Sequence, residues 1–166
     1  MSHYIDMFFG DVNPNTLHGE QVGVTTLTMS RLQNLILSKN NPPIIKPTKI
    51  DEDDMQARLG KEISRQCLKE LKSKALDREK AEKVNRYLNE NWESFADLLR
   101  KAMLPTERMW QAMDEIGAPR TGRDLGLPQA FYREIVLHAR EVRNRFTMLD
   151  MAGDSGFLEA FADQCG

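Results

Sequence analysis

The segment DEDDMQARLGKEISRQCLKEL, residues 51–71, decides the fold class of this chain. Its apolar side chains recur at every fourth position and therefore form one stripe along a helix: Met55, Leu59, Ile63, Cys67 and Leu71. Four acidic residues, 51–54, open the segment, where negative charge complements the unpaired backbone N–H groups of a helix N-terminus. The pattern predicts an amphipathic helix.

A second helical pattern lies upstream of this segment. Val22, Met29, Leu32 and Ile36 recur at helical spacing and predict a helix over residues 17–38. The turn-rich residues 11–16 before it suit a loop. Residues 39–49 contain three prolines, which prevent a continuous helix and predict an extended connector.

The downstream half also shows only helical patterns. Asp77 is expected to cap a helix whose pattern continues up to Pro105, and a short helix then stops at the Gly-Ala-Pro of residues 117–119. The longest pattern, residues 127–149, predicts one helix with a buried face, and a short helix over 157–162 follows. The best strand candidate, residues 21–26, does not alternate convincingly. We therefore expect an all-α fold, a multi-helix array of about six or seven helices, with residues 1–166 as a single helical domain.

Composition excludes several classes of protein. The 166 residues are 40% hydrophobic, enough for one core, and 25 acidic against 23 basic residues leave no basic face for nucleic acid. Cys67 and Cys165 stand far apart and form neither a disulfide framework nor a cysteine zinc site. No apolar run approaches the ~20 residues of a membrane span, and the first residues do not resemble a signal peptide. A cytoplasmic protein without membrane insertion is expected.

The candidate residues for chemistry are the histidines. His3 and His18 flank the loop near the N-terminus, and neutral imidazole is the commonest protein ligand of a catalytic metal. Spacing alone favours the interpretation that both are ordinary loop histidines, because a single His-Gly is a weak motif. His138 falls on an apolar stripe and fits a core histidine held by hydrogen bonds. The charged run 69–83 fits a solvated helical surface, and most of four arginines fit surface or interface positions: Arg133, Arg140, Arg143 and Arg145.

Three blocks of sequence carry a family resemblance. They are SHYIDM (residues 2–7) with LHGEQVGVTTL (17–27), IGAP (116–119) with LGLP (125–128), and YREIVLHAREVRNRFT (132–147). In this order they resemble the glycerol-1-phosphate dehydrogenases of the iron-containing alcohol dehydrogenase and dehydroquinate synthase-like superfamily. The resemblance spans most of the chain and is weakest over residues 39–101.

The resemblance implies that this chain is the C-terminal, helical half of a two-domain enzyme. The absent N-terminal α/β half would bind NAD or NADP, and a divalent metal (Zn, Ni or Fe) would lie in the cleft between the halves. The histidine of His-Gly, His18, would be a metal ligand, and His3 would be a catalytic residue beside substrate and nicotinamide. The remaining metal ligands would precede residue 1, so the chain alone is expected to be incomplete as an enzyme.

The implied reaction is hydride transfer between the nicotinamide and a small phosphorylated polyol, glycerol 1-phosphate or dihydroxyacetone phosphate. In such enzymes the metal lowers the pKa of the substrate hydroxyl, so that the alkoxide can expel hydride. Two alternatives stay open. The chain could belong to another polyol dehydrogenase or a 3-dehydroquinate synthase-like enzyme, or it could be a non-catalytic helical interaction module. If this chain exposes the apolar face that would pack on a nucleotide-binding domain, two copies are expected to pair through that face as a homodimer.

Overall fold

The computed structural model describes residues 1–9 and 16–165, and these residues form helices without any strand. The helices are α1 (Ser2–Phe9), α2 (His18–Leu37), α3 (Glu52–Lys74), α4 (Arg78–Ala102), α5 (Thr106–Glu115), α6 (Gln129–His138), the 3-10 helix η1 (Ala139–Val142), α7 (Met148–Ser155) and α8 (Leu158–Ala162). The predicted all-α, multi-helix array is confirmed. Of the loop predicted over residues 11–16, only Thr16 lies within the described residues.

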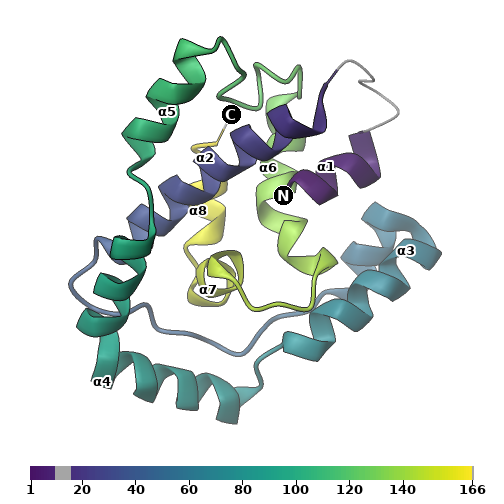
Figure 1. Cartoon of the computed structure of the whole chain (residues 1–166). Helices are drawn as coiled ribbons and strands as arrows, with labels where there is room; N and C mark the ends of the chain where they lie inside the picture. The colour runs from purple at the N-terminus through teal and green to yellow at the C-terminus, as the bar shows by residue number, and fades with distance from the viewer. Residues whose placement is uncertain (10–15, 166) are drawn as a thin grey trace.

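Helix α2 runs through the centre of the molecule and has α1, α5 and α7 packed against it (Figure 1). Helix α6 packs on α8, and α3 packs on η1, while the long helices α3 and α4 surround the central group. The main core is apolar and includes Leu32 and Ile36 of α2 with Ile135 and Val136 of α6, all fully enclosed. None of the described helices is long and apolar enough to cross a membrane.

The predicted caps form because they depend on local chemistry. Asp51 accepts a hydrogen bond from the backbone N–H of Asp54, and Asp77 accepts one from the backbone N–H of Lys80. Such caps contribute about 1 kcal/mol each. Helix α3 is kinked at Gly60, whose φ of 72° and ψ of 168° lie in a region that residues other than glycine rarely adopt.

The proline-containing connector between α2 and α3 is extended, as predicted, and is held along its length by side chains of α4. Asn85 bonds both backbone groups of Ile45, accepting from its N–H and donating to its carbonyl at 2.8 Å each. The indole N–H of Trp92 donates to the carbonyl of Lys39. The backbone groups that the connector cannot pair within a helix are therefore satisfied by tertiary contacts.

The prediction of one long helix over residues 127–149 is wrong. Helix α6 ends at His138, η1 continues to Val142, Arg143 is extended, and α7 begins at Met148. Thr147 and Asp150 form a capping box that starts α7 anew. Phe146, which the predicted helix would carry on its buried face, is 40% exposed.

Two further features of the N-terminal region were not anticipated from the sequence. Residues 2–9, where no helix was expected, form α1, which places Tyr4 and Ile5 in the main core. The strand candidate at residues 21–26 lies inside α2. Burial of an aromatic and a β-branched side chain against α2 stabilises α1 despite its short length.

Candidate functional site

His18 is the first residue of α2 and remains accessible, with 65% of its side chain exposed. The ring Nδ1 lies 3.2 Å from a carboxylate oxygen of Asp6, a residue of α1. This contact joins α1 to the end at which α2 begins. The carboxylate of Glu20 accepts a hydrogen bond from the backbone N–H of Leu17, which satisfies one of the free donors at the N-terminus of α2.

Asp6 was not identified from the sequence, and its position explains how His18 is oriented. A carboxylate that accepts the Nδ1–H of an imidazole fixes the ring orientation and leaves Nε2 with its lone pair free. Gly19, the residue after His18, has open space where a side chain would begin, so no close contact in the described structure requires glycine there.

His3 lies in α1 with its side chain exposed, three positions before Asp6. Residues three apart on a helix lie on the same side, so His3 shares the side of α1 that carries Asp6, while the contact with His18 is made by Asp6. Among the described residues, however, no group of three or more His, Cys, Asp or Glu side chains is arranged to hold a metal ion. The donors at this place, one imidazole and one carboxylate, do not complete a metal site by themselves.

A groove of about 450 Å³ runs along the exposed face of α2 beyond His18. It is bounded by the first residues of α1, by α2 and by the end of α4 with α5, and its lining is Met1, Ser2, Val22, Thr25, Thr26, Met29, Ser30, Gln33, Ala102, Met103, Leu104 and Met109. Val22 and Thr26 follow His18 at intervals of four, which places them on its side of the helix. No side chain of the lining is charged, and the amino group of Met1, whose pKa is lowered by burial, is the one titratable group among the lining residues.

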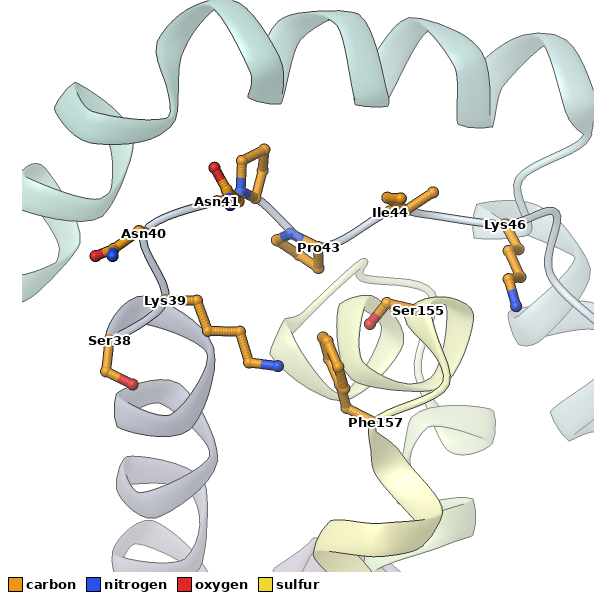
Figure 2. Close-up of a pocket in the computed structure, with 10 residues that line it drawn as sticks. Ser38, Lys39, Asn40, Asn41, Pro43, Ile44, Lys46, Ser155 and Phe157 are labelled. Atoms are coloured by element: carbon orange, nitrogen blue, oxygen red, sulfur yellow. The ribbon is translucent and has the colours of Figure 1, made fainter.

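A larger cavity, about 730 Å³, lies elsewhere, between the connector and the α7–α8 turn (Figure 2). Neither His3 nor His18 lines it. Within it the ammonium of Lys39 lies 3.4 Å from the centre of the Phe157 ring, a cation–π contact. Lys39 follows the C-terminus of α2 and faces Ser155 at the end of α7, where positive charge complements the helix dipoles. These contacts account for Lys39 without a ligand.

His138 is mostly buried and hydrogen-bonded, as its position on an apolar stripe predicted. Its Nδ1 lies 2.8 Å from a carboxylate oxygen of Glu141, and the guanidinium of Arg58 donates to both oxygens of the same carboxylate. The side chains of His138, Glu141 and Arg58 are 22%, 12% and 16% exposed. The group ties α3 to the end of α6, which is a structural role.

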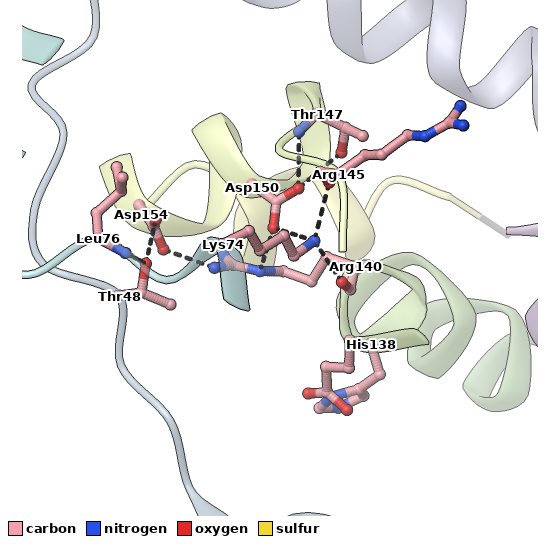
Figure 3. Close-up of polar contacts among 10 residues, drawn as sticks. Thr48, Lys74, Leu76, His138, Arg140, Arg145, Thr147, Asp150 and Asp154 are labelled. Atoms are coloured by element: carbon pink, nitrogen blue, oxygen red, sulfur yellow. Dashed lines mark hydrogen bonds and ion pairs between the residues drawn. The ribbon is translucent and has the colours of Figure 1, made fainter. Parts of the chain in front are cut away.

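A buried ion network lies where α3, η1 and α7 meet (Figure 3). Lys74 contacts Asp150 at 2.7 Å and donates to the carbonyls of Arg140 and Arg145, and Arg140 donates to Asp154 at 2.6 Å. Lys74 and Asp150 have side chains only 5% and 1% exposed. Two cations face two carboxylates, so the network is neutral. Burial lowers the pKa of Lys74, and its pairing with Asp150 opposes that shift.

The network corrects two expectations from the sequence. Lys74 lies in the charged run that was read as solvated surface, and Arg140 was grouped with the surface arginines, yet both are buried. Gly153 passes so close to Arg140 that a Cβ at this position would overlap the guanidinium. A signal was present in the sequence, since Asp150 and Asp154 are spaced by four and face one side of a helix.

Comparison with known protein families, curated proteins and solved structures gives no match for this chain.

Proposed function

We propose that this chain is the helical, metal-binding half of a glycerol-1-phosphate dehydrogenase-like oxidoreductase, which transfers hydride between NAD or NADP and a phosphorylated polyol. In this proposal it acts only together with a nucleotide-binding half. The observation that carries the proposal is the pair formed by His18 and Asp6, in which an exposed imidazole at a helix start is oriented by a carboxylate of a neighbouring helix.

The pair has the arrangement that metal-binding histidines commonly use. Such a histidine gives one ring N–H to a carboxylate and coordinates the ion through the other nitrogen. The carboxylate of Asp6 contacts Nδ1 of His18, so Nε2 is the nitrogen that would bind an ion. An exposed ion pair contributes little to the free energy of folding, about 0–1 kcal/mol. A gain in stability therefore does not explain why this pair is present.

The described residues supply too few donors for a metal site, and the proposal assigns the missing ligands to the nucleotide-binding half. The proposal also assigns the groups that bind the substrate phosphate to the nucleotide-binding half, because the groove beyond His18 has no charged side chain. His3 is proposed to act beside the substrate, since it lies one helical turn before Asp6. No reaction step is assigned to this chain alone.

A non-catalytic interaction module is the second candidate, and one observation favours it. Apolar side chains are exposed on α4 and at or near α5, notably Leu98, Leu104, Trp110 and Ile116. Exposed apolar side chains that lie together mark a face that packs on another protein. The surface also suits packing on a nucleotide-binding half, so only an activity measurement separates the two candidates.

The test is to co-express the chain with the nucleotide-binding half of a glycerol-1-phosphate dehydrogenase and to measure NAD or NADP reduction with glycerol 1-phosphate. The proposal expects activity from the pair, none from His18→Ala, and a roughly 10- to 100-fold loss from Asp6→Ala, because the orienting carboxylate is removed. His138→Gln is the matched control and should keep its activity. An inactive pair, or full activity of His18→Ala, would overturn the proposal.

A further inference from the structure

Tyr4 of α1 is enclosed in the main core, and its hydroxyl donates to a carboxylate oxygen of Glu134 at 2.9 Å. Glu134 is half-buried and lies on α6, 130 residues further along the chain, so the bond joins two helices that are distant in sequence. Burial raises the pKa of Tyr4, and the hydrogen bond to Glu134 raises it further, so the hydroxyl keeps its proton and remains a donor. The bond is therefore a directional link between α1 and α6.

The same short helix carries the partner of His18. Asp6 lies two positions after Tyr4, and its carboxylate is 3.2 Å from Nδ1 of His18. Successive residues of an α-helix are about 100° apart around the axis, so two positions place Asp6 on nearly the opposite side of α1 from Tyr4. Tyr4 contacts α6 while Asp6 contacts the start of α2, and any rotation of α1 about its axis therefore moves both contacts together.

Apolar burial alone does not set that rotation sharply. Ile5 is enclosed like Tyr4, and Phe8, one turn further along, has its ring centroid 4.6 Å from that of Tyr4. Such contacts keep α1 on the core, but hydrophobic attraction is not directional. A hydrogen bond weakens when its length or angle changes, so the bond to Glu134 restricts the rotation of α1 further. The exposed ion pair on the other side of α1 cannot do this by itself, because such a pair contributes little to the free energy of folding.

We propose that Tyr4 is a positioning residue, whose hydrogen bond to Glu134 fixes the orientation of α1. That orientation holds the Asp6 carboxylate on Nδ1 of His18 and leaves Nε2 free for the ion. The inference rests on the proposed function for the role of His18 as a metal ligand, but the orientation of the ring needs no metal. A ligand has to be held within about 0.5 Å of its productive position, so a bond that is distant from the ion still affects binding.

The readout is the tautomer of His18 in the chain alone, measured by long-range ¹⁵N–¹H NMR spectra of the histidine rings at about pH 9, where an ordinary imidazole is neutral. The wild type should carry its ring proton on Nδ1, facing Asp6. Tyr4→Phe and Glu134→Leu should each remove this preference, so that the Nε2–H form becomes populated. Glu134→Gln should keep it, because the amide carbonyl still accepts the tyrosine O–H.

Tyr132→Phe is the matched control. Tyr132 is also buried, and its hydroxyl oxygen lies 2.6 Å from that of Thr28, between α6 and α2. Its replacement should lower the thermal midpoint by roughly 2–4 °C, as Tyr4→Phe should, because each removes one hydrogen bond, but it should leave the tautomer of His18 unchanged. His138 is the internal reference, because its Nδ1 contacts a different carboxylate.

An unchanged tautomer in Tyr4→Phe, or an equal change in Tyr132→Phe, would refute the positioning role. In the co-expressed pair, Tyr4→Phe should lower NAD or NADP reduction by less than Asp6→Ala does. It should add no further loss to Asp6→Ala, because it acts through that carboxylate, and losses that multiply would also refute the role. The tautomer needs no activity, so an inactive pair with the expected tautomers would contradict the proposed function alone.

Discussion

Replacement of Lys74 by methionine tests the buried ion network directly. The ammonium makes three contacts, with Asp150 at 2.7 Å and with the carbonyls of Arg140 at 2.6 Å and Arg145 at 3.2 Å. Methionine keeps much of the packing but leaves the Asp150 carboxylate buried without its nearest cation. Breaking a buried pair in this way costs about 3–5 kcal/mol.

The lower end of that range is expected, because the carboxylate of Asp150 keeps other partners. The backbone N–H and hydroxyl of Thr147 still donate to it, and Nε of Arg140 remains 3.4 Å away. We therefore expect a loss of about 3 kcal/mol in the free energy of unfolding. For a chain of this size the thermal midpoint should fall by roughly 6–12 °C.

The assay is urea unfolding followed by far-ultraviolet circular dichroism, with Lys72→Met as the matched control. Lys72 is on the same helix and pairs with Glu52 at 2.6 Å, but its side chain is 53% exposed. Its replacement should change stability by less than about 1 kcal/mol. If Lys74→Met lost no more stability than Lys72→Met, the network would not be the link that holds α3, η1 and α7 together.

Three further outcomes follow from the same structure. Gly153→Ala should lower the free energy of unfolding by about 3 kcal/mol, because the new Cβ displaces the Arg140 guanidinium from its buried carboxylates. Urea unfolding measures this change, and a variant as stable as the wild type would contradict it. Gly60→Ala should cost about 1–3 kcal/mol, since φ is 72° there, and an unchanged midpoint would contradict the kink. Burial raises the pKa of the Cys165 thiol to about 11, so at pH 8 its thiolate fraction should be about 100-fold below that of a thiol of pKa 9. Slow reaction with a thiol reagent, made fast by denaturant, would verify it.

Much of the fold was predictable because local chemistry fixes it. The acidic start of α3, the Asp77 cap and the prolines of the connector each act within a few residues, and the structure has all three. The break at residues 139–147 could not be read from periodicity, because a distant residue stabilises it: Lys74 bonds the carbonyls of Arg140 and Arg145. A buried lysine and an exposed one look alike in a charged stretch of sequence.

The site was only partly predictable, for a similar reason. The helix predicted over residues 17–38 from its apolar spacing placed His18 near a helix start, and α2 begins there. Its partner Asp6 belongs to a helix that the sequence did not indicate, since α1 gains its stability from burying Tyr4 and Ile5. The pairing of Asp6 with His18 exists only once α1 has packed on α2.

Metal content of the chain paired with a nucleotide-binding half tests the role of His18 most directly. The complex would be equilibrated with Zn²⁺ and a competing chelator, and the bound ion counted for the wild type, His18→Ala and His3→Ala. We expect one retained ion in the wild type and in His3→Ala, and none in His18→Ala. Equal retention by His18→Ala would show that this imidazole is not a ligand and would contradict the account.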